Sequence, residues 1–69
     1  MEMITVISSN IDSIGYDAKK KKMRIVFSSG AEYDYDGVPK KIFDQMIVSG
    51  SVGSFFYKNI KGKFSYSLV

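Results

Sequence analysis

The central part of the chain alternates apolar and polar residues with a period of two, which is the pattern of half-buried β-strands. The alternation covers residues 11–36 and is interrupted by two short polar segments, residues 18–21 and residues 28–30. Three strands joined by two hairpins are therefore predicted, and they form an antiparallel β-meander. The apolar positions that share one face of this meander are Ile14, Tyr16, Met23, Ile25, Phe27, Tyr33 and Tyr35.

The register of the second hairpin can be predicted, because a slip of one residue would exchange the two faces of a strand. A two-residue turn at residues 29–30 would place Ile25 opposite Asp34, whereas a three-residue loop over residues 28–30 places Ile25 opposite Tyr33. The longer loop is favoured, and it requires a left-handed backbone at Gly30. The predicted pairs are Met23 with Tyr35, Ile25 with Tyr33, Lys22 with Asp36, Arg24 with Asp34, Ile14 with Ile25, and Tyr16 with Met23.

Two amphipathic helices are predicted after the strands. The first begins at Pro39, whose fixed backbone angle suits a first helical turn, and runs to about Val48. The second follows a break at residues 49–51 and ends near Gly62. Apolar residues at helical spacing predict the buried stripes, which are Ile42, Phe43, Met46 and Ile47 in the first helix and Val52, Phe55, Phe56 and Ile60 in the second.

A sheet with one apolar face, followed by two amphipathic helices, predicts a two-layer α+β domain with both C-terminal helices packed on that face. Each end of the chain adds a strand, because residues 3–7 are rich in β-branched residues and Phe64, Tyr66 and Leu68 alternate with polar residues. The C-terminal segment is expected to be a terminal edge strand that extends the sheet or crosses to a neighbouring subunit. Residues 1–69 are expected to form a single domain.

The composition of the chain narrows its function. The 69 residues include neither cysteine nor histidine, which excludes disulfides, zinc-finger ligands and thiol or imidazole catalysis. We therefore expect a protein that is not an enzyme and has no metal or cofactor. A core of this size rarely supplies more than about 3–5 kcal/mol, so a homo-oligomer is expected. No segment resembles a membrane span or a signal peptide, so we expect a cytoplasmic protein with no membrane partner.

Several short motifs follow one another in a distinctive order. They are Ser8-Ser9-Asn10-Ile11, Ile14-Gly15-Tyr16-Asp17, Gly30, Tyr33-Asp34-Tyr35, Val38-Pro39, Ser51-x-Gly53, Phe56 and Ile60-Lys61. Their order and spacing resemble the KTSC domain over nearly the whole chain, although Phe64 stands where a tyrosine is expected and Tyr57 where an asparagine is frequent. The resemblance implies a bacterial or phage protein, since this module occurs alone in such proteins and at the C-terminus of some lysyl-tRNA synthetases. It also implies RNA binding, the role suggested for the family.

The strongest candidate ligand site combines Lys58, Lys61 and Lys63 with the neighbouring rings of Tyr57 and Tyr66. Lysines neutralise phosphates while aromatic side chains stack on bases, so this mixture is typical of sites for anionic, base-containing ligands. The alternative is that the lysines stabilise the carboxyl end of a helix against its dipole while the rings simply pack. Both interpretations remain open from the sequence.

A second basic segment, residues 19–22, lies at the tip of the first hairpin, where Lys20 and Lys21 could follow a phosphate backbone. A solvated turn explains the same lysines and is favoured. Tyr33 and Tyr35 are interpreted as core and not as an exposed stacking platform, since they face apolar residues across the sheet. The carboxylates at residues 32, 34 and 36 are interpreted as partners of cations on the neighbouring strand, in preference to a metal site.

The leading functional hypothesis is a non-catalytic binding module for RNA, or for a small nucleotide held between the subunits of an oligomer. The rival hypothesis is a protein-interaction module, in which the edge strand over residues 64–68 pairs with another chain. The presence of a single arginine favours the rival, because bidentate recognition of phosphates and bases relies on arginine. A third hypothesis is a phage protein that sequesters or inhibits a host factor, or sequesters a signalling nucleotide.

Overall fold

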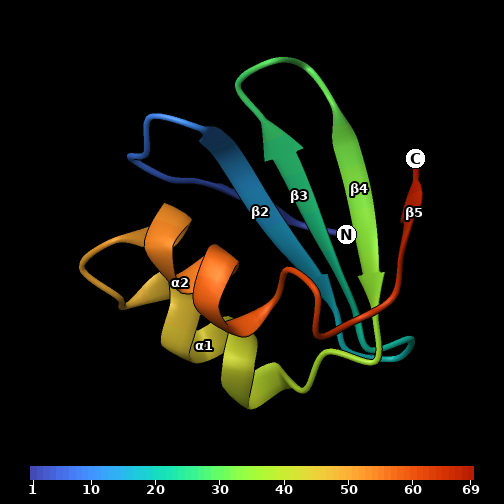
Figure 1. Cartoon of the computed structure of the whole chain (residues 1–69). Coiled ribbons are helices and arrows are strands. Elements are labelled where there is room, and N and C mark those ends of the chain that lie inside the picture. The colour runs from blue at the N-terminus through green and yellow to red at the C-terminus, as the bar shows by residue number, and fades with distance from the viewer.

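The computed structural model describes all 69 residues and contains five strands and two helices. Their order is β1 (Met3–Thr5), β2 (Ile11–Asp17), β3 (Lys22–Phe27), β4 (Glu32–Asp36), α1 (Lys40–Ile47), α2 (Val52–Asn59) and β5 (Tyr66–Leu68). The strands form one antiparallel sheet, and both helices lie on one side of it (Figure 1). Neither helix has the length and apolar character needed to cross a membrane. The predicted α+β architecture is confirmed.

The sheet keeps the order of the chain, so every strand pairs with its neighbours in sequence. Both terminal strands extend the sheet within the same chain, β1 beside β2 and β5 beside β4. β1 is shorter than the predicted strand over residues 3–7, and Ile7 is fully exposed beyond its end. At the other end of the chain, β5 begins only at Tyr66, because Phe64 lies in the bend after α2 and packs against the core.

The register of both hairpins agrees with the prediction. In the second hairpin, Ile25 lies opposite Tyr33, and the backbone N–H of Phe27 donates to the carbonyl of Ala31 at 2.8 Å. This bond closes the three-residue loop, in which Gly30 has a φ of 96°. The other predicted pairs are also present: Met23 with Tyr35, Lys22 with Asp36, Arg24 with Asp34, Ile14 with Ile25, and Tyr16 with Met23.

One apolar core fills the space between the sheet and the helices. Its eleven buried residues are Ile11, Ile14, Met23, Ile25, Tyr35, Val38, Phe43, Met46, Val52, Phe56 and Ile60. Three residues of the predicted helical stripes are less buried than expected: the exposed fraction of Ile47 is 36%, and Ile42 and Phe55 are only partly buried. Each of them lies one position from a buried neighbour, which is Phe43, Met46 or Phe56, and one position turns a helix by about 100° away from the sheet.

Tyr16 on β2 fastens the first helix to the sheet. Its ring stacks on Phe43 of α1, with 5.2 Å between the ring centroids. Its hydroxyl donates to the carbonyl of Val38 at 2.6 Å, in the segment that leads from β4 into α1. The start of α1 is therefore held by one polar and one aromatic contact to the same side chain.

The opposite, outer face of the sheet carries an ion pair between Arg24 on β3 and Asp34 on β4. The Nε and Nη2 atoms of Arg24 donate to the two carboxylate oxygens of Asp34 at 2.8 and 3.1 Å. This forked hydrogen bonding holds the pKa of Asp34 below its usual range and raises the pKa of Arg24. A second pair on this face joins Lys22 and Asp36 at 3.5 Å.

We predict that Gly30→Ala lowers the free energy of unfolding by about 1 kcal/mol or more, because a Cβ is strained at this positive φ. No atom lies near enough to that Cβ to add a clash, so the loss reports backbone strain alone. Gly50→Ala is the matched control, since Gly50 also has open space around it but does not have a positive φ. Urea denaturation of both variants tests this prediction, and equal midpoints for the two would contradict it.

We also predict that the stabilising contribution of Asp34 to the folded protein is lost in acid. Because the pKa of Asp34 is lower in the folded state, its contribution is present above about pH 4 and is lost as the pH falls through the folded-state value. The difference in unfolding free energy between wild type and Asp34→Asn, up to about 1 kcal/mol at pH 7, should therefore shrink at pH 3. Asp44→Asn serves as the control, since the Asp44 pair with Lys40 is exposed on both sides. A pH-independent difference for Asp34→Asn would refute the prediction.

Candidate ligand-binding groove

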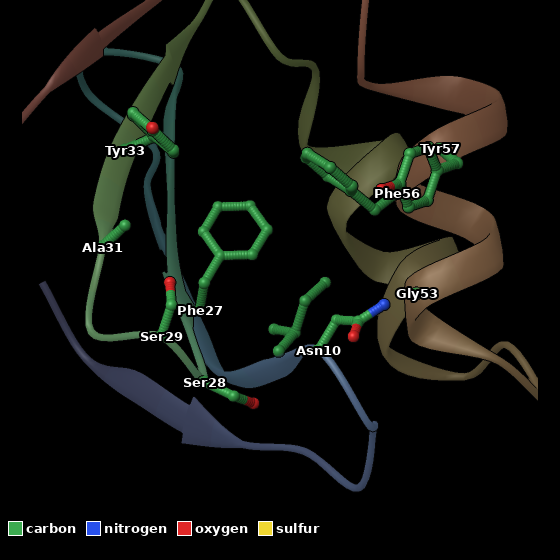
Figure 2. A pocket seen from close by; sticks show the side chains of 10 residues that line it. Asn10, Phe27, Ser28, Ser29, Ala31, Tyr33, Gly53, Phe56 and Tyr57 are labelled. Carbon is green, nitrogen blue, oxygen red and sulfur yellow. The ribbon is translucent and has the colours of Figure 1, made fainter.

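A groove runs along the helix-facing side of the sheet, between α2 and the strands β3, β4 and β5. It consists of two adjoining hollows, of about 380 and 220 Å³, whose shared lining residues are Phe27, Tyr33, Phe56 and Tyr57. The larger, which we call the Asn10 hollow, reaches the polar side chains of Asn10 and Ser29 (Figure 2). The smaller, the tyrosine hollow, is completed mainly by Tyr35, Lys61 and Tyr66. Together they form the aromatic groove.

The rings of the aromatic groove contact one another in an unbroken series. Ring centroids lie 5.3 Å apart for Tyr66 and Tyr33, and 5.6 Å apart for Tyr33 and Phe27. Phe27 contacts Phe56 at 5.5 Å, and Phe56 contacts Tyr57 at 5.8 Å. These pairs meet edge to face, an arrangement that contributes about 0.5–1.5 kcal/mol per pair beyond burial. The groove is therefore formed by mutual ring contacts that exist before any ligand arrives.

Tyr35 and Tyr33 have different roles in this groove. Tyr35 is buried, and burial raises the pKa of its phenol, with smaller contributions from Tyr66 and Tyr33. Its interpretation as a core residue is confirmed. Tyr33 is only partly buried and lines both hollows, so its interpretation as core was incomplete. The reason is that its neighbouring strand, β5, carries exposed side chains over which no helix packs.

Three of the predicted site residues, Tyr57, Lys61 and Tyr66, line the same tyrosine hollow. Tyr57 lies on α2 with 57% of its surface exposed, and the Nζ atom of Lys61 lies 4.7 Å from the centroid of its ring. Lys61 lies in the turn that follows α2, where its backbone N–H donates to the carbonyl of Phe56 at 2.9 Å, and this turn places its side chain over the ring of Tyr57. An exposed contact between a cation and a ring is worth about 0.5–1 kcal/mol, so a stacking ligand could displace Lys61 at low cost.

The other two lysines of the predicted cluster flank the groove. Lys58 lines a neighbouring hollow of about 440 Å³, between residues 7–10 and the start of α2, which shares Asn10 and Tyr57 with the Asn10 hollow. Lys63 lines a shallow depression beside Tyr66. Neither of them forms a salt bridge, and the same is true of Lys61. The predicted cluster is therefore spread along the groove and not gathered at one point.

The lysine loop, residues 18–21, lies apart from the groove. It joins β2 to β3 and so lies at the end of β3 opposite to the loop that borders the Asn10 hollow. The carboxylate of Asp17 accepts from the backbone N–H groups of Lys19 and Lys20 at 3.0 and 3.3 Å, and Lys21 has a φ of 52°. Lys20 and Lys21 line none of the hollows described above. The loop is thus an ordered turn away from the other predicted site residues.

The charged residues that line the groove and its neighbouring hollows all have a positive charge. No aspartate or glutamate lines any of the four hollows, whereas Lys58, Lys61 and Lys63 each line one of them. Asp34 and Asp36 lie on the outer face of the sheet, paired with cations of β3. No group of three or more carboxylates in the chain is arranged to hold a metal ion. The groove therefore presents aromatic rings and positive charge to a ligand.

Asn10, Ser29 and Gly53 line the Asn10 hollow but were not among the site residues predicted from the sequence. Asn10 and Gly53 both belong to the short motifs of the chain, and this membership was the available signal for them. Neither residue is part of an apolar periodicity, the pattern from which the elements were predicted. A Cβ added to Gly53 would lie 3.3 Å from the hydroxyl of Ser8, so a glycine here lets residues 8–10 lie close to α2. Asn10 and Gly53 meet because the β1–β2 connection lies beside the first turn of α2, and Ser29 lies near them because the N–H of Ser28 donates to the carbonyl of Asn10 at 2.8 Å.

Comparisons with known proteins place the chain in one family. The family model of the KTSC domain matches residues 7–64. The crystal structure of a KTSC domain protein from Yersinia pestis is 37% identical in sequence and superposes with a TM-score of 0.96, covering 99% of this chain and 96% of that one. The resemblance seen in the sequence motifs is therefore confirmed.

Related sequences occur both as small proteins and within larger ones. A protein from Tsukamurella paurometabola is 36% identical over 62 residues, which cover 90% of this chain and 92% of that protein. A lysine–tRNA ligase from Trichormus variabilis is 34% identical over 58 residues, which cover 84% of this chain but 10% of the ligase. With its family model matched from residue 7 to residue 64, the chain belongs to the KTSC domain family.

Proposed function

We propose that this KTSC domain is a non-catalytic module that binds an anionic, base-containing ligand, RNA or a small nucleotide, in the aromatic groove. The observation that carries the proposal is the combination of exposed rings with unpaired lysines and no carboxylate along one groove. Stacking of a base on an aromatic side chain contributes about 1–3 kcal/mol and tolerates any base. Lysines beside those rings would neutralise the phosphates that link successive bases.

The arrangement of charge and rings supports binding more than it supports catalysis. Lys61, in the turn after α2, lies over Tyr57, so one side of the groove offers a ring and a cation next to each other. General acid–base chemistry would have to come from lysine and tyrosine alone, because the chain has no histidine or cysteine and no carboxylate lines the groove. RNA as the ligand is further supported by the relatives named lysine–tRNA ligase, proteins whose name states an RNA substrate.

We predict that the double substitution Lys58→Ala and Lys61→Ala weakens binding of a short single-stranded RNA. Each phosphate contact that is lost should lower the slope of log affinity against log salt by about 0.7. The measurement is a fluorescence polarisation titration between about 50 and 200 mM salt, where electrostatic binding varies strongly. A mononucleotide competitor in the same assay shows whether the ligand is a polymer or a small nucleotide.

The double substitution Lys20→Ala and Lys21→Ala is the matched control, because it removes the same charge from the lysine loop. Loss of these two lysines should reduce the affinity for long RNA, which can reach the loop, and should leave mononucleotide binding unchanged. If wild type binds neither RNA nor mononucleotide at about 50 mM salt, or if both double variants behave like wild type, the proposal is wrong.

A second candidate function, a protein-interaction module, is favoured by the free edge of β5, and we propose a second copy of this chain as its partner. The carbonyl of Ser65 and the N–H of Val69 bond to β4, so by alternation Tyr66 and Leu68 turn their backbone groups to the free edge. Both side chains are more than half exposed. Residues 64–69 contain neither charge nor proline, the residues that usually protect an edge from pairing.

We predict that the protein self-associates at micromolar concentration and that Leu68→Lys shifts it toward the monomer of 7.8 kDa. A lysine on each of two paired edges would place like charges opposite each other, which disfavours the pairing. Val48→Lys is the control, since Val48 is also exposed but lies after α1, away from the sheet edge. Sedimentation velocity over a range of concentrations tests this, and a wild-type monomer throughout would exclude self-association.

A further inference from the structure

The Asn10 hollow has a distinct chemistry at each of its ends. Figure 2 shows the carboxamide of Asn10 reaching toward Gly53 of α2, while Phe27, Phe56 and Tyr57 provide aromatic surface beside it. The volume of about 380 Å³ is at the lower end of the range of about 300–1,000 Å³ for sites of small molecules. An aromatic wall beside a polar end suits one flat group that carries hydrogen-bonding atoms on its edge.

Asn10 is fixed by its backbone while its side chain is free. Its backbone N–H donates to the hydroxyl of Ser8 at 3.3 Å, and its carbonyl accepts from the N–H of Ser28 at 2.8 Å. The carboxamide itself bonds to no other residue, so an N–H₂ donor and a carbonyl acceptor remain available side by side. The anchored backbone therefore presents an unpaired amide to the hollow.

The nearby serines differ in their capacity to bind a ligand. The hydroxyl of Ser28 is already engaged by the carboxylate of Asp12 at 3.1 Å. The hydroxyl of Ser29 has no such partner, and it lies on the same side of the hollow as Phe27 (Figure 2). The free hydrogen-bonding groups at this end are thus one amide and one hydroxyl.

We propose that the Asn10 hollow holds one base of the ligand and that the carboxamide of Asn10 reads the edge of an adenine. This proposal rests on the proposed function of the aromatic groove and adds the identity of the base. On its Hoogsteen edge adenine carries a donor, N6, next to an acceptor, N7, and this pair matches the oxygen and nitrogen of an asparagine side chain, whereas the same edge of uracil has no acceptor nitrogen. The ring of Phe27 supplies the stacking surface for the base.

The chain is poorly equipped to read the Hoogsteen edge of a guanine at the same place. That edge carries two acceptors, N7 and O6, which are matched best by arginine. The single arginine of the chain, Arg24, is held by Asp34 on the opposite face of the sheet.

Lys58 lines the neighbouring hollow, which shares Asn10, Gly53 and Tyr57 with the Asn10 hollow. The phosphate of a bound adenine nucleotide would therefore find a cation next to the base pocket.

The test compares the binding of a short oligouridine with that of the same oligouridine containing one central adenine. Wild type should bind the adenine-containing RNA about tenfold more tightly, within the range for one bidentate pair. Asn10→Ala should reduce this preference to less than about twofold, through a loss of affinity for the adenine-containing RNA. Asn59→Ala is the matched control, because the amide of Asn59 bonds to the carbonyl of Phe55 on α2 and does not line the hollow.

A second measurement does not depend on a variant that folds. Addition of adenosine monophosphate to isotopically labelled wild type should shift the side-chain N–H₂ resonances of Asn10 and should leave those of Asn59 unmoved. A shift caused by a blocked dipeptide amide and not by adenosine monophosphate would identify a peptide pocket and overturn the proposal.

The remaining outcomes separate the two proposals. If the wild type binds both RNAs equally, and the Lys58→Ala and Lys61→Ala variant still weakens binding, the reading of adenine is wrong while the proposed function of the groove holds. If Asn10→Ala weakens both RNAs to the same extent, Asn10 is not a base-reading residue. If no RNA or mononucleotide binds to wild type, both proposals fail.

Discussion

The structure depends on how two short helices cover one apolar face of a five-stranded sheet. Each helix has eight residues and is about 12 Å long, whereas the five-stranded sheet is about 19 Å wide, measured across its strands. Tyr16 fastens α1, and Phe56 fastens α2 over Phe27 and Tyr35. The cover ends near β4, so the side chains of β5 remain exposed. The aromatic groove forms along this boundary because rings that face the helices are only partly covered there.

The register of the hairpins also separates the charges of the molecule. Placing Ile25 opposite Tyr33 puts Arg24 opposite Asp34 on the other face, where ion pairs satisfy the carboxylates. No acidic residue therefore lines the groove, and the lysines at the end of α2 and just after it border the groove without salt-bridge partners. One pairing choice thus produces a neutralised outer face and a positive groove. A one-residue slip would have placed carboxylates in the core and in the groove.

The proposed binding mode uses the groove from end to end. Rings occupy its middle, lysines border it at successive positions, and a free amide lies at its wider end. Cations and rings give affinity that does not depend on sequence, whereas an anchored amide discriminates between bases. The edge of β5 borders the same groove through Tyr66. Pairing of two copies at this edge would bring two grooves together, which joins the binding hypothesis with the expectation of self-association.

The sequence determined the elements, the register and the face of the meander that the helices cover, because period-two alternation and opposite charges specify strand pairing locally. It also indicated Tyr57, Lys61 and Tyr66, which meet in one hollow. The tertiary structure decided the rest. Lys20 and Lys21 lie at the far end of β3, and Asn10 joins the groove only because residues 8–10 lie beside α2, which follows them by some forty positions. Periodicity reports which face of an element is buried, but it carries no information about where two distant segments approach each other. That approach is set by packing: Gly53 admits the hydroxyl of Ser8, and the short helices leave the neighbouring rings uncovered.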